Sequence, residues 1–531
     1  MHHREVTLND KYDLVEGKAY MTGIQALVRL PLDRKRLDLR NNVNTAGFIS
    51  GYRGSPLGGY DQQLRAAQKW LDEHDIKFWE GLNEDLGATA VWGSQQLGLF
   101  PGAKYDGLFG IWYGKAPGVD RTGDVFKHAN AAGSSALGGV LAIVGDDHNC
   151  KSSTLPSQSE FAMMDAEIPV LNPASIQDVL DYGIHGWEMS RFSGTWAGMV
   201  ALADTMDSGS VVQVGLDRFT IVQPDFALPE EGVHMRRGDA PLLKEQRLRQ
   251  IKIPAAQAYV RANRLDHVIL PSPKPRVGIV VTGQAARDVF EALAALGIDP
   301  KEAGRLGLAI YKVAMPWPLE PQRIREFCTG LERVLVIEHK RPLIEDQLRS
   351  VLYRLPDNQR PFIEGKHDRD GNRLLSDIAS ITIPEMAAAL MEVIPEGWDT
   401  SRATAYFDRV GRAGEAARTN ASPTVRTPHF CSGCPHNTST VVPEGSRALA
   451  GIGCHYMANF MPDRHTDMTS QMGGEGIAWV GQHWATDEPH VFVNLGDGTY
   501  SHSGSLAIRA AVTSGANMTY KILYNDAVAM T

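Results

Sequence analysis

The sequence predicts an α/β protein built from several doubly wound parallel sheets, and three stretches support this fold class. Residues 491–524 read as a strand, a turn, a helix and a second strand, and residues 277–338 repeat a strand, helix, strand, helix, strand order. Residues 45–59 read as a buried strand that enters a glycine-rich loop. Strands that alternate with helices form parallel sheets, and open sheets of this kind bind ligands at the carboxyl ends of their strands.

Length and composition are those of an ordinary globular protein with three or four domains. The chain has 531 residues, of which 43% are hydrophobic and 22% are charged. No window reaches the roughly twenty uninterrupted apolar residues of a membrane span, and the polar first residues do not resemble a secretory signal. A net charge of -9 gives no basic surface for nucleic acid. We therefore expect a cytoplasmic protein with no membrane partner and no nucleic-acid partner.

The first hundred residues contain two features that could bind a ligand. After a predicted helix over residues 21–32 and a basic loop over residues 33–40, the strand at 45–50 runs into a loop with four further glycines, GYRGSPLGG. This loop either binds a ligand or is a plain glycine-rich connection. A helix is predicted from Glu84 to Leu99, and Glu84 either serves the N-terminus of that helix or reaches a bound heterocycle.

The middle of the chain combines one polar strand end with a second α/β segment. A buried strand over residues 139–144 ends in GDDHNCKSS, where we expect substrate or cofactor contacts rather than a metal or a nucleophile. Residues 220–270 are rich in charge and proline and predict a wrapping segment or a linker. Strands at 277–282, 308–313 and 334–338, with helices at 285–296 and from Pro321, then predict another parallel sheet.

The last strand pair carries a constellation suited to a metal-bound diphosphate. Gly496-Asp497-Gly498 follows the strand at 491–495, and Asn525 lies 28 residues after Asp497. The glycines allow a phosphate to approach the backbone, while the carboxylate and amide oxygens suit Mg²⁺. The pattern resembles the thiamine diphosphate motif, in which a carbonyl two residues after the Asn completes the Mg²⁺ site. That carbonyl belongs here to Ala527.

Three of the five cysteines lie close together in the sequence, with the spacing of a metal site. Two residues separate Cys431 from Cys434, and nineteen residues separate Cys434 from Cys454. Such thiolates bind an iron–sulfur cluster, which needs a fourth thiolate, or zinc, for which His436 or His455 could be the fourth ligand. Cys150 and Cys328 are expected to be buried thiols.

Five segments together resemble the 2-oxoacid:ferredoxin oxidoreductases. They are GYRGSPLGGYD, NEDLGATAVWGSQQ, GDDHNCKSST, CSGCPHNTST and GDGTY with the later YND. Over essentially the whole chain, the pattern is most similar to the indolepyruvate ferredoxin oxidoreductases of the bacterial single-chain type. Because relatives of this type continue after the Mg²⁺ motif, the resemblance implies that the chain is an N-terminal fragment.

The resemblance implies a role for each candidate residue. Glu84 would hydrogen-bond N1′ of the thiamine diphosphate aminopyrimidine, and Ser55, Arg53 and His148 would contact the substrate. Gly496, Asp497, Gly498, Asn525 and Ala527 would bind the diphosphate, with Asp497, Asn525 and Ala527 holding Mg²⁺. Cys431, Cys434 and Cys454 would bind a 4Fe-4S cluster. The arginine that binds the substrate carboxylate in pyruvate-specific relatives is missing, and the replacement is Arg53, Lys127, His128, Lys151 or backbone amides.

The implied domains are a pyrimidine-binding domain with linker (1–270), a transketolase C-terminal-like domain (274–398), a linker (399–427) and an incomplete diphosphate-binding domain (428–531). The implied reaction is oxidative decarboxylation of indolepyruvate to the acyl-coenzyme A with reduction of ferredoxin. The alternatives are another 2-oxoacid, a non-oxidative decarboxylase, or a scaffold that only binds cofactor and cluster. Because the two halves of the cofactor site come from different domains, we expect a homodimer.

Overall fold

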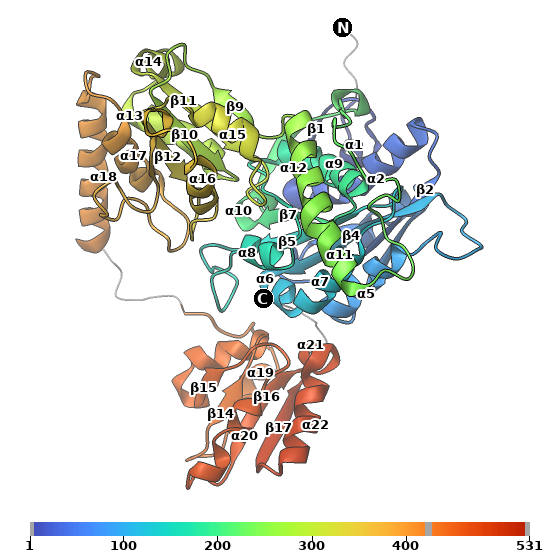
Figure 1. Cartoon of the computed structure of the whole chain (residues 1–531). Coiled ribbons are helices and arrows are strands. Elements are labelled where there is room, and N and C mark those ends of the chain that lie inside the picture. Colours follow the sequence, from blue (N-terminus) through green and yellow to red (C-terminus); the bar gives the residue numbers. More distant parts are fainter. Residues whose placement is uncertain (1–4, 420–426, 526–531) are drawn as a thin grey trace. The chain divides into compact units, whose positions relative to one another are not determined.

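The structure is a computed structural model that describes residues 5–419 and 427–525, arranged in two compact units (Figure 1). The first unit extends to residue 417, without residues 152–154, and the second unit follows it. Both units contain mainly parallel sheet covered by helices, so the predicted α/β class is confirmed. No helix in the described ranges is both long enough and apolar enough to cross a bilayer. The cytoplasmic location stays a prediction.

The first unit begins with a six-stranded parallel sheet. Its strand order is β3-β2-β4-β5-β7-β6, and all its pairs are parallel. The strands are β2 (Thr45–Gly51), β3 (Ile76–Glu80), β4 (Gly107–Lys115), β5 (Val140–Asp146), β6 (Val170–Leu171) and β7 (Ala197–Leu202). Strands β2 and β5 confirm the predictions at 45–50 and 139–144. The strand order reverses between β2 and β4, so a ligand crevice is expected outside their carboxyl ends.

Helices cover both faces of this sheet. Helices α2 (Gly23–Arg40) and α9 (Ile176–Ser193) pack on one face, and α5 (Glu84–Ser94) and α7 (Gly123–Ala132) pack on the other. Successive residues of β4 alternate between the two cores, with Tyr113 on the α2 side and Trp112 on the α5 side. Fully burying one large apolar side chain stabilises the fold by roughly 1.5–3 kcal/mol, so these cores fix the strand ends in place.

The predicted basic loop at 33–40 is wrong, because these residues form the second half of α2. Their charges are buried and paired. The Arg34 guanidinium binds Asp38 one turn later, and the Arg191 guanidinium of α9 donates to both Asp38 oxygens at 2.7 and 2.8 Å. Charged residues that suggest a solvated loop therefore line a helix–helix contact here.

The segment predicted as a wrap or linker at 220–270 contains a long helical run in its second half. Residues 241–262 form one helical run of α11 (Pro241–Arg247), a π-helical turn (Leu248–Lys252) and α12 (Ile253–Ala262). The Lys252 ammonium is buried and donates to the carbonyls of Asn130 and Ala131 at the end of α7. A cation is favourable at a helix C-terminus, and this contact joins the helical run to the first sheet.

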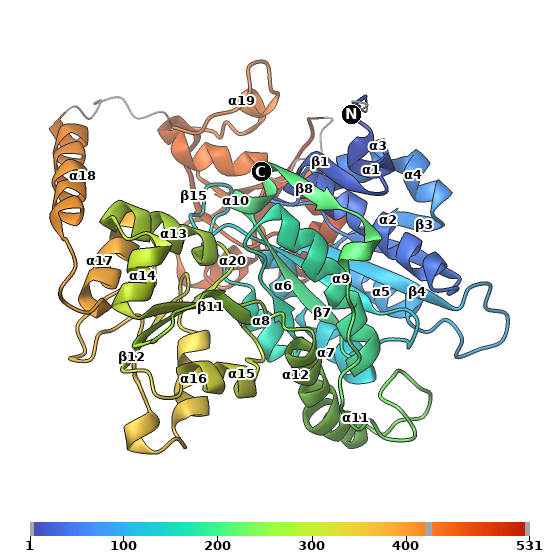
Figure 2. The same cartoon turned by 90° about the horizontal axis from the view of Figure 1, so that it is seen from above.

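A second sheet with order β13-β12-β10-β11-β9 completes the first unit. Its strands are β9 (His267–Leu270), β10 (Val277–Thr282), β11 (Leu308–Val313), β12 (Arg333–Ile337) and β13 (Phe362–Glu364), of which only β9 is antiparallel. Figure 2 shows α13 (Ala285–Leu296) and α17 (Ile383–Val393) on one side of it, with α15 (Pro321–Cys328) and α16 (Ile344–Leu352) on the other. The predicted strand and helix order is confirmed.

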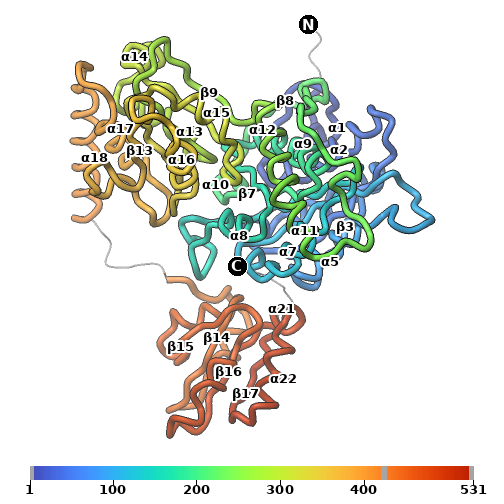
Figure 3. Tube along the Cα trace, in the orientation of Figure 1, coloured from blue at the N-terminus to red at the C-terminus, as the bar shows by residue number. Residues whose placement is uncertain are grey.

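Part of the segment predicted as a linker at 399–427 is helical. Helix α18 (Ser401–Thr419) runs along the outside of the second sheet's helices, beside α17 (Figure 3). Ala403 is its one buried residue, while Tyr406 and Phe407 pack at the edge of the core. Most of this helix faces solvent, which is why its composition resembles that of a linker. The domain boundaries stay predictions.

The second unit is a four-stranded parallel sheet with order β15-β14-β16-β17. Its strands are β14 (Ala448–Ala450), β15 (Thr466–Thr469), β16 (Val491–Gly496) and β17 (Met518–Leu523). The predicted pairing of the last two strands is confirmed. The predicted turn at Asp497 is instead the start of a helical run that continues as α22 (Ser505–Ser514). In this sheet the strand order reverses between β14 and β16.

Candidate active site

Glu84 is held at the carboxyl edge of the first sheet by the start of α5. The preceding residue, Asn83, caps the helix, since its side-chain oxygen accepts the Leu86 N–H at 3.0 Å. The Trp112 indole N–H donates to the Glu84 carbonyl at 2.9 Å and ties the first turn to β4. Glu84 is 3% exposed. The structure therefore places a buried carboxyl group beside the carboxyl end of β4.

Two glycines make room for the Glu84 side chain. A Cβ on Gly118, in α6 (Ala116–Arg121), would lie 2.5 Å from both Cγ and Oε1 of Glu84. A Cβ on Gly114 of β4 would lie 3.5 Å from the same Cγ. The carboxyl group thus packs against backbone at the end of β4, and a substitution at Gly118 must displace it. Its contact with a cofactor stays a prediction.

The glycine-rich loop after β2 packs on the next strands as expected for a ligand-binding loop. Pro56 and Leu57 lie over Gly145 at the end of β5, where a Cβ would meet them at 3.1–3.2 Å. Ser55 is half-buried in this loop. Arg53 forms ion pairs with Asp61 at 3.4 Å and Glu80 at 3.0 Å. The charge of Arg53 is therefore already balanced within the fold.

The other predicted anchors for the substrate carboxylate are exposed. Lys127 pairs with Asp165 at 2.6 Å, and its side chain is 53% exposed. The His128 side chain is 67% exposed, and Lys151 also faces solvent. A carboxylate bound at such positions would be screened by water, which weakens the ion pair.

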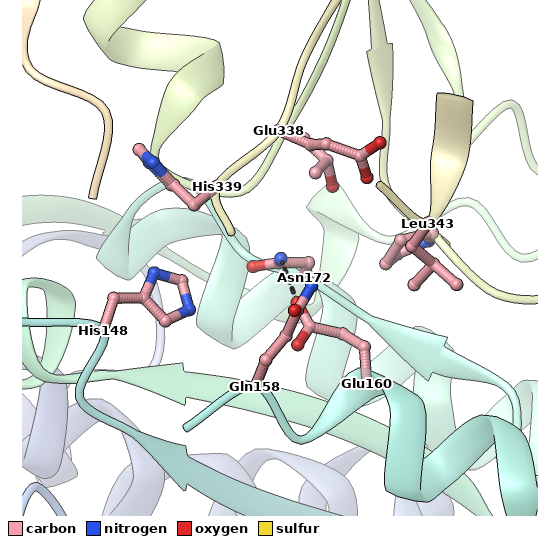
Figure 4. A pocket seen from close by; sticks show the side chains of 9 residues that line it. His148, Gln158, Glu160, Asn172, Glu338, His339 and Leu343 are labelled. Carbon is pink, nitrogen blue, oxygen red and sulfur yellow. Dashed lines mark hydrogen bonds between the residues drawn. The ribbon is translucent and has the colours of Figure 1, made fainter. Parts of the chain in front are cut away.

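His148 lies in a polar pocket between the carboxyl ends of the two sheets of the first unit. Figure 4 shows its ring directed into this pocket, and the ring centroid is 5.5 Å from that of His339. Within the described residues, neither ring nitrogen of His148 has a hydrogen-bond partner. Burial, and secondarily the charge of Lys340, lowers the pKa of His148 to about 4, so the imidazole is neutral at pH 7. The predicted substrate contact of His148 stays a prediction.

Sequence reasoning missed the polar residues that surround His148. Glu160 accepts a hydrogen bond from the Asn172 amide at 3.2 Å, and its other oxygen has no partner among the described residues. Burial and the neighbouring Asp146 raise the pKa of Glu160 to about 8. Strands β6, β10 and β12 bring residues far apart in sequence to this point, so no local pattern signals the pocket. Its lining includes Glu160, Asn172, Thr282, Glu338 and His339.

In the second unit, the loops after β14 and β16 meet at the point where the strand order reverses. The Gly451 N–H donates to His455 Nε2 at 3.1 Å, and the Thr499 hydroxyl donates to the Ile452 carbonyl at 3.2 Å. The other ring nitrogen of His455 faces Gly496, where a Cβ would lie 3.5 Å away. The His455 ring therefore packs beside the end of β16, directly before Asp497.

Asp497 and Asn525 lie at neighbouring strand ends. Asp497 directly follows β16, and Asn525 lies two residues beyond β17, the parallel partner of β16. Two oxygen donors from side chains at one sheet edge fit Mg²⁺, which takes its remaining ligands from water and phosphate. Ala527, the predicted third ligand, lies outside the described residues.

Of the three predicted cluster cysteines, Cys454 is influenced by the charges of the other two and of Asp497. Burial first, and then the charges of Cys434, Cys431 and Asp497, raise the pKa of the Cys454 thiol. Cys431 and Cys434 share a tight turn in which the Cys434 N–H donates to the Cys431 carbonyl at 3.0 Å. Across the part of the chain that the structure describes, no three His, Cys, Asp or Glu side chains are arranged to hold a metal ion. Cluster binding therefore stays a prediction.

Sequence reasoning also missed Glu475 in this unit. Its carboxyl group is buried, accepts the Gly473 N–H at 2.8 Å and packs against Gly451. Burial raises the pKa of Glu475 to about 7. The sequence QMGGEG, an acid after two glycines, is the one signal that could have indicated it.

Polar residues lie at the reversal points of these parallel sheets, where α/β proteins commonly bind small molecules. A family model described as "Indolepyruvate oxidoreductase domain" matches residues 267–417. The chain is 25% identical to indolepyruvate oxidoreductase subunit IorA of Pyrococcus horikoshii, over 98% of this chain and 76% of the relative. It is 26% identical to the IorA subunit of Pyrococcus abyssi, over 81% of this chain and 66% of the relative.

The match extends to Methanothermobacter marburgensis, whose IorA subunit is 22% identical over 99% of this chain and 78% of the relative. Over most of its length the chain is therefore similar to the IorA subunits of indolepyruvate oxidoreductases. The prediction that it is a fragment stays a prediction.

Solved structures are more distant. A 2-oxoglutarate:ferredoxin oxidoreductase from Magnetococcus marinus, with 2-oxoglutarate, coenzyme A and succinyl-CoA bound, has a TM-score of 0.49 and 13% identity. The match covers 71% of this chain and 65% of that chain. A split-gene transketolase, described as an inactive β4 tetramer, has a TM-score of 0.39 and 12% identity, over 69% of this chain and 97% of that one.

Proposed function

We propose that this chain carries the thiamine diphosphate site of an enzyme that oxidatively decarboxylates an arylpyruvate, with indolepyruvate as the preferred substrate. The acyl group passes to coenzyme A and the electrons pass through a 4Fe-4S cluster to ferredoxin. The choice of indolepyruvate follows the names of the relatives, which are indolepyruvate oxidoreductase subunits. The homodimer and the cytoplasmic location belong to this proposal.

The buried Glu84 carboxyl group is the observation that carries the proposal. Thiamine diphosphate, when bound, supplies the nucleophilic carbon and the electron sink for decarboxylation. Glu84 holds a proton at N1′ of the aminopyrimidine and so favours the tautomer in which the exocyclic nitrogen acts as a base. Burial on a glycine backbone supports this role, because the carboxyl group then keeps one orientation and water is excluded.

The second unit offers donors that suit the other half of the cofactor. Asp497 and Asn525 would hold Mg²⁺, with the Ala527 carbonyl as a third ligand, and the backbone of Gly496 and Gly498 would face the diphosphate. The thiols of Cys431, Cys434 and Cys454 are soft donors that suit an iron–sulfur cluster. The charges of Cys431, Cys434 and Asp497 all act on Cys454, which supports placing cluster and diphosphate at one edge of this sheet.

The test is coenzyme A-dependent reduction of a viologen dye by the anaerobically purified full-length protein with any subunits that copurify. Replacing Glu84 with Gln keeps its size and removes the acid, and we expect turnover with indolepyruvate to fall by roughly 10²- to 10⁴-fold. The matched control is Asp85→Asn, because Asp85 is the next residue and only forms a surface ion pair with Arg121 at 3.3 Å. We expect this control to change turnover less than twofold, as is usual for exposed pairs.

Three outcomes would contradict the proposal. Wild-type turnover in the Glu84→Gln variant would show that Glu84 takes no part in the reaction. Aldehyde release without dye reduction would identify a non-oxidative decarboxylase. Mg²⁺-dependent thiamine diphosphate binding without turnover of indolepyruvate, pyruvate or 2-oxoglutarate would leave a cofactor-binding scaffold.

A further inference from the structure

Lys115, which is absent from the predicted site, is a buried cation at the carboxyl end of β4. It is the last residue of the strand and is 5% exposed. It lies at the carboxyl end of β4, one residue from Gly114 and three from Gly118, which both pack against Glu84. A charged side chain is rarely buried to this extent without a specific electrostatic partner.

Strand alternation places Lys115 on the face that carries the glycine-rich loop. In the parallel pair of β4 and β5, Lys115 is the register partner of Gly145, so the two residues point to the same face of the sheet. On that face Gly145 contacts Pro56 and Leu57, the residues that follow Ser55. Tyr113, two residues before Lys115, packs in the same core as Leu57. Lys115 therefore lies on the same face of the sheet as this loop, whereas Glu84 packs on the opposite face.

The charges around Lys115 leave it suited to an anion. Burial lowers the pKa of Lys115, and the charge of Asp147 acts against that shift. An ammonium group has three N–H donors, so it can contact more than one acceptor at a time. Of the four predicted anchors, Arg53 is balanced by two acids, and Lys127, His128 and Lys151 are exposed.

We propose that Lys115 binds the carboxylate of the 2-oxoacid, in the role that the sequence left open among Arg53, Lys127, His128, Lys151 and backbone amides. This inference rests on the proposed function, since it assumes a 2-oxoacid substrate. Lys115 and Ser55 would then contact the substrate from one face of β4 while Glu84 serves the cofactor from the other. A carboxylate held by a buried ammonium is bound more strongly than one held at the surface.

The experiment compares two inhibitors that differ only in charge, indole-3-propionate and indole-3-propionamide, against dye reduction with indolepyruvate. In Lys115→Met we expect the KM for indolepyruvate and the inhibition constant of the propionate to rise by about 10- to 100-fold. The inhibition constant of the neutral amide should change less than twofold. Lys115→Arg should restore part of the propionate binding, because it keeps the charge.

Two further variants separate binding from folding. Lys69→Met removes an exposed lysine whose side chain is 74% exposed, and it should leave both inhibition constants unchanged. Should Lys115→Met fail to fold because Asp147 loses its counter-charge, the double variant Lys115→Gln with Asp147→Asn removes both charges and takes its place.

The inhibition constants distinguish a role of Lys115 in substrate binding from a role in the stability of the fold. Equal weakening of both inhibitors would show that Lys115 only supports the fold, and unchanged binding of both would exclude it from the site. A wild-type protein that binds neither indolepyruvate nor propionate would overturn the proposed function together with this inference.

Discussion

Replacing Gly118 with Ala should move the Glu84 carboxyl group with little change to the backbone. The added Cβ would lie 2.5 Å from Glu84 Oε1, whereas ordinary contact begins near 3.4 Å, so the oxygen must shift by about 0.9 Å. Misplacing a reacting group by about 1 Å can cost roughly 100-fold in rate, and we expect a loss of this size in kcat. Overpacking should also lower the free energy of unfolding by about 1–3 kcal/mol.

The matched control is Gly123→Ala, at the first residue of α7. A Cβ there meets nothing within 4 Å, so the substitution should raise helix stability by up to about 1 kcal/mol and leave turnover unchanged. The assay is viologen dye reduction with indolepyruvate, and urea unfolding of the same preparations gives the stability. A wild-type kcat in the Gly118→Ala protein would refute this reasoning, because it would show that turnover does not depend on the present position of the Glu84 carboxyl group.

Two predictions concern stability in the first unit, both measured by urea unfolding. Asp38→Asn leaves the buried charges of Arg34 and Arg191 without the acid that they share, and it should lower the free energy of unfolding by about 3–5 kcal/mol. The control is Asp217→Asn, at a side chain that is 95% exposed, which should change the free energy of unfolding by less than about 0.5 kcal/mol. Burial raises the pKa of Glu160 to about 8 in the folded protein, compared with about 4.5 in the unfolded chain. The stability that this carboxyl group contributes is therefore fully present below pH 4.5 and is lost as the pH rises through 8. Glu160→Gln should therefore lose less stability than wild type between pH 5 and 8, and an unchanged pH slope would argue against a protonated Glu160.

The sequence predicted the elements whose apolar residues repeat regularly. Strands β10 and β11 and helix α13 begin and end where their patterns do, because short apolar runs bounded by glycine and proline leave little choice of register. The second half of α2 could not be predicted in this way. Its buried charges are balanced partly by Arg191 and Glu188, which lie about 150 residues later in the chain.

The same distinction between local pattern and long-range contact applies to the residues of the candidate site. Glu84, Asp497 and the cysteines stand in short motifs with local spacing, so sequence could indicate them. Lys115 stands in no such motif, and its significance comes from its register with Gly145 and its burial. The pocket around His148 depends on two sheets meeting, which no local pattern can report.

In the proposed site, strand β4 separates the residues assigned to the substrate from the residue assigned to the cofactor. Gly114 faces Glu84, while Lys115 shares a face with Gly145 and the loop that carries Ser55. Substitutions in that loop can alter which side chain of an oxoacid fits without touching the packing of Glu84. In such an arrangement substrate choice can diverge between relatives while the handling of the cofactor's proton is inherited unchanged.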